Sequence, residues 1–151
     1  MNKYKKIADW LDGYVPAYSW IFFNVSPSEP DELTLNSVQN ERELQTFIDG
    51  AREVEFLFAL DLAKEFDIGT SEINLNAIEE FNKISDWVET QNIAKNFPDF
   101  GDNIIVESVE VLETVPSVSV DNQNQVAKYQ GQFRITYIET RKEIVEDVNN
   151  D

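Results

Sequence analysis

The side chains that could do chemistry in this sequence are mainly carboxylates. Cysteine and histidine are both absent from its 151 residues. This excludes disulfides, thiolate nucleophiles, zinc sites built from Cys or His, and every mechanism that uses imidazole as a base. What remains for a catalyst is carboxylate, Lys, Tyr or Ser chemistry, or a metal ion held by oxygen ligands.

The best candidates for a paired acid and base are Glu79 and Glu80, together with Glu89 later in the same segment. Glycosidases use two carboxylates in this way. These three residues fall on a predicted amphipathic helix, where charged side chains are expected to face the solvent. We therefore interpret them as the solvated side of that helix, and a carboxylate-based hydrolase stays an alternative.

Two short motifs lack the context that would give them meaning. The triplet DFG at residues 99–101 matches the magnesium-binding triplet of protein kinases, but no glycine-rich loop or histidine-containing catalytic loop accompanies it. The nearby acids also lack the spacing of a twelve-residue calcium loop. Asn24 begins a glycosylation acceptor sequence, but no apolar stretch of signal-peptide length precedes it. We predict no catalytic residue, no cofactor and no metal site.

The loop KNFPDFGDN, residues 95–103, contains two phenylalanines beside a proline and a glycine. Pro and Gly stop a helix and turn the chain, but such a loop does not need apolar rings. Either the rings fold back onto the core of the same domain, or they face another molecule. If they face another molecule, six residues would form the contact: Asn96, Phe97, Pro98, Asp99, Phe100 and Gly101.

The charge of the chain limits its partners. There are 29 acidic and 12 basic residues, which gives a formal net charge of −17. Binding of phosphate backbones relies on Lys and Arg that displace counterions, so nucleic acid and anionic membrane surfaces are unfavourable partners. No stretch approaches the roughly 20 apolar residues of a membrane span. We expect a protein that is made and used in the cytoplasm, with no membrane contact.

The first half of the chain predicts one helix and several strands. Ile7, Trp10 and Leu11 have helical spacing, so residues 3–12 predict a short amphipathic helix that ends at Gly13. Residues 18–26 predict a strand, and 26–32 an exposed connection. Residues 33–51 are ambiguous and are interpreted as two short strands or one arm of a hairpin. A clearer strand follows from the alternation of five apolar residues: Val54, Phe56, Phe58, Leu60 and Leu62.

The second half predicts one long helix and two strands. The helix follows Gly69, is capped by Ser71 or Asn76, and ends before Pro98. Its apolar stripe is made by Ala77, Ile78, Phe81, Ile84, Trp87 and Val88. Strands are predicted at residues 103–113 and 125–139, with a hairpin tip at 121–125.

This order of elements indicates an α+β fold. We expect one domain at residues 1–139: an antiparallel or mixed β-sheet with one long helix packed on one face and a short N-terminal helix. Residues 140–151 are acidic and poor in apolar groups, so we expect a flexible C-terminal tail.

The chain from residue 86 to 137 resembles a family of small proteins from tailed bacteriophages, often labelled minor capsid proteins, that are similar to tail terminators. The resemblance lies in a helix and loop followed by a strand. The helix and loop positions are Trp87, Glu89, Gln91, Asn96, Pro98, Asp99 and Gly101, and the strand positions are Tyr129, Gln130, Gln132, Arg134 and Tyr137. The preceding strands match only loosely.

The resemblance implies a structural virion protein and no enzyme. It implies a homo-oligomer, a hexameric ring at the head-proximal end of the tail tube, which stops tube polymerisation and joins the tail to the head-completion proteins. Its partners would be the tail-tube protein and a head-completion protein, and genomic DNA would pass through an acidic lumen that repels phosphates. The protein would be assembled in the host cytoplasm and located in the virion.

Besides the hydrolase, two alternative functions and one question about the loop remain open. The protein could be a head-closure or connector protein of the neck, or an acidic adaptor that mimics DNA. Within the ring hypothesis, Phe97 and Phe100 either form part of the contact between subunits or fold over the end of their own helix.

Overall fold

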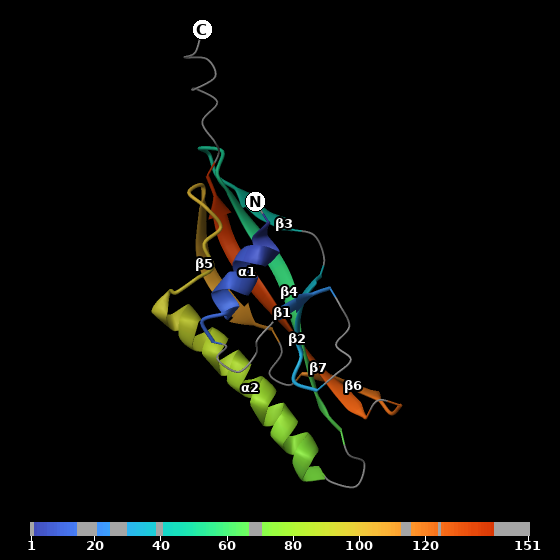
Figure 1. Ribbon diagram of the computed structural model, residues 1–151. Helices are drawn as coiled ribbons and strands as arrows, with labels where there is room; N and C mark the ends of the chain where they lie inside the picture. The colour runs from blue at the N-terminus through green and yellow to red at the C-terminus, as the bar shows by residue number, and fades with distance from the viewer. Residues whose placement is uncertain are drawn as a thin grey trace.

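The fold is taken from a computed structural model, which describes residues 2–14, 21–24, 30–38, 41–66, 71–112, 116–123 and 125–140. These residues form two helices and a seven-stranded sheet (Figure 1). Most of the predicted strand at 18–26, most of the predicted connection at 26–32 and the tail beyond residue 140 lie outside the described residues.

Two 14-residue strands form the centre of the sheet, β4 (Arg52–Glu65) and β7 (Val126–Glu139). They pair antiparallel over their whole length, from Arg52 opposite Glu139 to Glu65 opposite Val126. Every second side chain in each strand is apolar, which is the pattern of a sheet with one face on a core. The inward set is buried: Val54, Phe56, Phe58, Leu60 and Leu62 in β4, and Ala127, Tyr129, Phe133, Ile135 and Tyr137 in β7.

Each central strand has two shorter strands on its outer side, which pair with different parts of its length. β2 (Leu33–Ser37) and β3 (Arg42–Thr46) both pair with β4, and β5 (Ile104–Val111) and β6 (Ser117–Asp121) both pair with β7. All four pairings are antiparallel. β1 (Ile21–Phe23) adds a parallel partner to β2, so the sheet is mixed, in the order β1-β2-β4-β7-β5.

Both helices, α1 (Lys3–Leu11) and α2 (Ser71–Ala94), pack on the inward side chains of the sheet (Figure 1). The Tyr4 ring of α1 lies 4.9 Å from the Phe56 ring of β4. From α2, the Phe81 ring covers Gly131 so closely that an added Cβ would lie 2.7 Å from it. The opposite face of the sheet has no helix against it among the described elements.

The predicted α+β fold is confirmed, with both helices and the mixed sheet. The ambiguous residues 33–51 form two short strands, of which β3 makes a hairpin with β4. The long helix begins by Ser71, so Asn76, the alternative start, lies inside it. That residues 1–139 form a single domain stays a prediction.

Candidate functional site

The loop after α2 begins with a helix C-cap of the Schellman type. Lys95 has a left-handed φ of 57°, and its N–H donates to the Asn92 carbonyl at 3.1 Å. The N–H of Asn96 donates to the Gln91 carbonyl at 2.9 Å, and the Asn96 amide donates to the Gln91 side chain at 2.6 Å. These bonds satisfy carbonyls that the helix end would otherwise leave without partners. Asn96 therefore fixes the direction in which the loop leaves the helix.

Helix α1 holds the start of this loop from the other side. The indole N–H of Trp10 donates to the Asn96 carbonyl at 2.8 Å. The Trp10 ring lies 4.9 Å from the Trp87 ring of α2, and Tyr14 meets Trp87 edge-on at 5.7 Å. The three aromatic side chains join the two helices where the loop begins.

The expectation that Phe100 contacts another subunit is corrected by its position. Its side chain is 1% exposed. Its ring lies edge-on to Phe56 at 6.1 Å and to Tyr137 at 5.8 Å, within the core. Pro98 is also buried, and half-buried Phe97 packs against the core. Phe100 thus follows the alternative, in which the ring folds over its own domain, because burial of an aromatic side chain stabilises the fold. For Phe97, contact of the exposed part of the ring with another subunit stays a prediction.

Three of the six candidate interface residues remain on the surface: Asn96, Asp99 and Gly101. The Asp99 carboxylate accepts a hydrogen bond of 2.9 Å from the Gly101 N–H, which forms a turn, and Gly101 has a φ of 106°. Asp99 in the DFG triplet therefore shapes the loop. Among the described residues, no group of three or more acidic side chains could hold a metal ion. Contact of these three residues with another subunit stays a prediction.

The three candidate carboxylates lie in different surroundings. Glu79 and Glu89 are exposed, whereas Glu80 is half-buried and lies 2.7 Å from the Lys64 ammonium group. Lys64 also pairs with Asp31. This ion-pair cluster joins β4, α2 and the turn before β2, so its observable role is structural.

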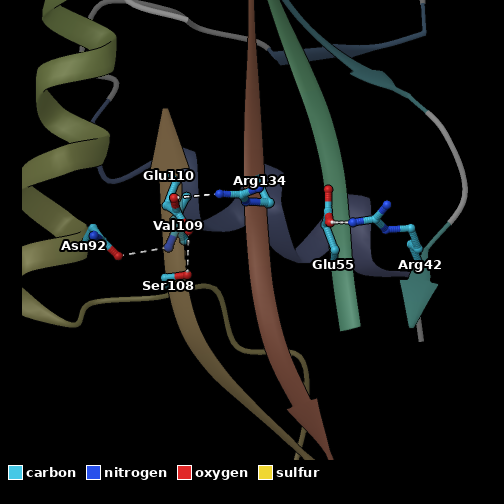
Figure 2. A network of polar contacts seen from close by, with 7 residues as sticks. All are labelled: Arg42, Glu55, Asn92, Ser108, Val109, Glu110 and Arg134. Atoms are coloured by element: carbon cyan, nitrogen blue, oxygen red, sulfur yellow. Dashed lines mark hydrogen bonds and ion pairs between the residues drawn. The ribbon is translucent and has the colours of Figure 1, made fainter. Parts of the chain in front are cut away.

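The helix-free face of the sheet carries a row of ion pairs across four strands, which the sequence did not reveal. Arg42 of β3 pairs with Glu55 of β4 at 3.1 Å, and Arg134 of β7 pairs with Glu110 of β5 at 2.9 Å (Figure 2). The hydrogen bond from Arg134 to Glu110 raises the pKa of Arg134 despite partial burial, and the Glu55 charge adds to this. We call these four residues the charged row. Each pair joins two different strands, so it depends on the cross-strand register, which the sequence alone does not give.

A second polar group lies on the same face. The Asp61 carboxylate of β4 accepts two hydrogen bonds of 2.8 Å, one from the Asn36 amide of β2 and one from the Gln130 amide of β7. Three strands are thereby joined through one carboxylate. Because hydrogen bonds to a charged group are stronger than neutral ones, this group reinforces the register of the sheet.

Helix α2 is joined to the irregular part of β5. The register of β5 on β7 shifts between Val106 and Ser108. Just after this shift, the Val109 N–H donates to the Asn92 side chain of α2 at 2.9 Å (Figure 2). Because β5 is the last strand in the sheet order, this bond gives a backbone donor of that edge strand a partner from the helix.

The chain matches no protein-family model and no curated protein sequence. Neither helix in the described parts of the chain combines the length and the apolar character needed to cross a membrane.

Proposed function

We propose that this protein is a non-catalytic virion protein that terminates the tail tube of a bacteriophage as a ring of identical subunits. The support from sequence is the resemblance over residues 86–137. The support from geometry is the position in the fold of the residues that carry this resemblance. Trp87, Asn96 and Gly101 define the helix end and the turn, and Tyr129 and Tyr137 are buried in the central strand. The shared residues therefore maintain an architecture and do not assemble a catalytic site.

The single observation that carries the proposal is the layered build of the subunit. One face of the sheet is covered by α1 and α2, and the other bears the charged row (Figure 2). Such a subunit can offer a polar sheet face to a lumen while its helices and hairpins contact neighbours. Because the chain has a net charge of −17, a ring of copies would repel DNA phosphates from its lumen.

The charged row also bears on the alternative of a DNA mimic. A mimic needs carboxylates that can meet the cations of a DNA-binding protein. Glu55 and Glu110 on the open face already pair with Arg42 and Arg134. The wall of a lumen does not need these carboxylates to bind a partner. The two ion pairs therefore favour the structural role over the DNA mimic.

The test is the mass of the purified chain, alone and with the tail-tube protein of the same phage, measured by light scattering. The proposal expects a closed ring or a complex that caps tubes. A monomer that leaves tube growth unchanged, together with competition against DNA for a basic protein, would replace it by the DNA-mimic alternative. Density at the neck, away from the tube end, would place the protein among the head-closure proteins.

A further inference from the structure

The hairpin between β3 and β4 presents an isoleucine to solvent at its tip. Ile48 is fully exposed, and Phe47 and Leu44 of the same hairpin are 36% and 40% exposed. The tip is well defined by hydrogen bonds. The Phe47 N–H donates to the Ala51 carbonyl at 2.7 Å, and the Ala51 N–H donates to the Asp49 carboxylate at 3.0 Å. A firmly held turn that projects an apolar side chain is suited to a contact with another surface.

An apolar groove lies elsewhere on the same chain, between α1 and the first two strands. Its volume is about 230 Å³. Lys5 lies at its side, and its apolar lining consists of Tyr4, Ala8, Ile21, Phe23 and Leu35. Phe23 is 45% exposed, although its ring packs against the Tyr4 ring at a tilt of 46° with 5.1 Å between the centroids. The groove is thus a small, partly open apolar site at one end of the sheet order.

The N-terminal turn of α1 is basic where a helix prefers acids. Three of the 12 basic residues of the chain, Lys3, Lys5 and Lys6, lie within four positions, and the first turn has no acidic residue. The helix dipole makes this arrangement unfavourable. Glu41 pairs with Lys3 at 2.8 Å. Within the described part of the chain, the exposed Lys5 ammonium contacts the Asp9 carboxylate at 3.7 Å. Three lysines at an unfavourable position in a strongly acidic chain indicate that their positive charge is used in binding.

We propose that the hairpin tip of one copy, with Ile48 as its apolar anchor, fits into the groove beside α1 of the next copy. In this contact Asp49 of one copy faces the basic turn around Lys5 of the next. Because the two charges are opposite, we choose the hairpin of a second copy as the occupant of the groove. The tip and the groove are different surfaces, so the contact is heterologous and repeats head to tail, as a ring requires. The inference rests on the proposed function, in which copies of this chain form a ring.

Disulfide trapping tests the contact directly, because the chain has no cysteine of its own. Chains with Ile48→Cys are mixed with chains carrying Ala8→Cys and oxidised at high concentration. The expected product is a mixed dimer that reductant separates, since a disulfide needs Cα atoms within about 7 Å. The matched control replaces Ile48→Cys by Leu75→Cys, an exposed apolar position on α2. Equal yields with the two partners would overturn the inference.

Charge reversal gives an independent readout by sedimentation. Asp49→Lys and Lys5→Glu should each weaken self-association, and the double variant should restore it, because every contact joins position 49 of one copy to position 5 of the next. Ile48→Asp should weaken association at least about tenfold, the factor expected when an isoleucine loses its burial. Unchanged association in Ile48→Asp, with rings still formed, would overturn the contact and leave the proposed function standing. If the disulfide forms but the protein does not cap tail tubes, the contact will be supported and the proposed function overturned.

Discussion

The indole N–H of Trp10 donates a hydrogen bond of 2.8 Å to the carbonyl oxygen of Asn96, and thereby joins two segments that are 86 residues apart in the chain. This bond links the short helix α1 to the loop that follows α2. It explains how a nine-residue helix, too short to be stable alone, has a defined place in the fold. It also holds the start of the loop at residues 95–103 against α1.

We predict that Trp10→Phe lowers the free energy of unfolding by about 1–2 kcal/mol, because the ring is largely kept while the partly buried Asn96 carbonyl loses its donor. Urea unfolding measures this. Tyr14→Phe is the control, since the Tyr14 ring also packs on Trp87 and its hydroxyl has no hydrogen bond to another described residue. A loss of the same size in both variants would show that the Trp10 bond has no special role.

Lys95→Gly should stabilise the protein. Lys95 has a left-handed φ of 57° at the C-cap of α2, and glycine adopts this conformation without the cost of a Cβ atom, which suggests a gain of about 0.5–1 kcal/mol. Thermal or urea unfolding would detect it. The matched control is Lys83→Gly, at an exposed position inside the same helix, where glycine should cost about 1 kcal/mol. Destabilisation by both changes would contradict the cap geometry.

Phe100→Ala should cost about 3–5 kcal/mol, because it leaves a cavity between Phe56 and Tyr137. Ile93→Ala, at a position 82% exposed on α2, should change the stability by no more than about 0.5 kcal/mol. Both values come from chemical denaturation of the purified chain. A small effect of Phe100→Ala would mean that the ring is outside the core and would return it to the candidate interface.

The sequence predicted the elements better than the contacts between them. Strand β4 was clear because five apolar residues alternate in it, and α2 because its apolar stripe has helical spacing. The charged row could not be predicted, since Arg134 and Glu110 become neighbours only through the register of β5 on β7, which includes a bulge. Phe100 illustrates the same limit. Its apolar type was evident, but whether it faced inward depended on the turn that Asp99 and Gly101 form.

Glu107 predicts a pH dependence of stability. Partial loss of hydration raises its pKa, and the neighbouring Glu53 carboxylate raises it further. A carboxyl group whose pKa is higher in the folded state destabilises that state above the folded pKa, and this penalty disappears below the unfolded pKa. Glu107→Gln should therefore add a few tenths of a kcal/mol at neutral pH, after allowance for solvent screening, and nothing in acid.

Unfolding curves of Glu107→Gln and of Glu89→Gln at both pH values test this. Glu89→Gln removes an equal charge from an exposed position on α2, so it controls for the net charge of −17. If both variants gain equally at neutral pH, the general charge is the cause and the pairing with Glu53 is not.

The most direct test of the central claim is to polymerise the tail-tube protein with and without this chain and to measure tube lengths by electron microscopy. If the protein terminates the tail tube, the tubes will stop growing and carry a ring of this protein at one end. Tubes of unchanged length without a bound ring would contradict the role of a tail terminator.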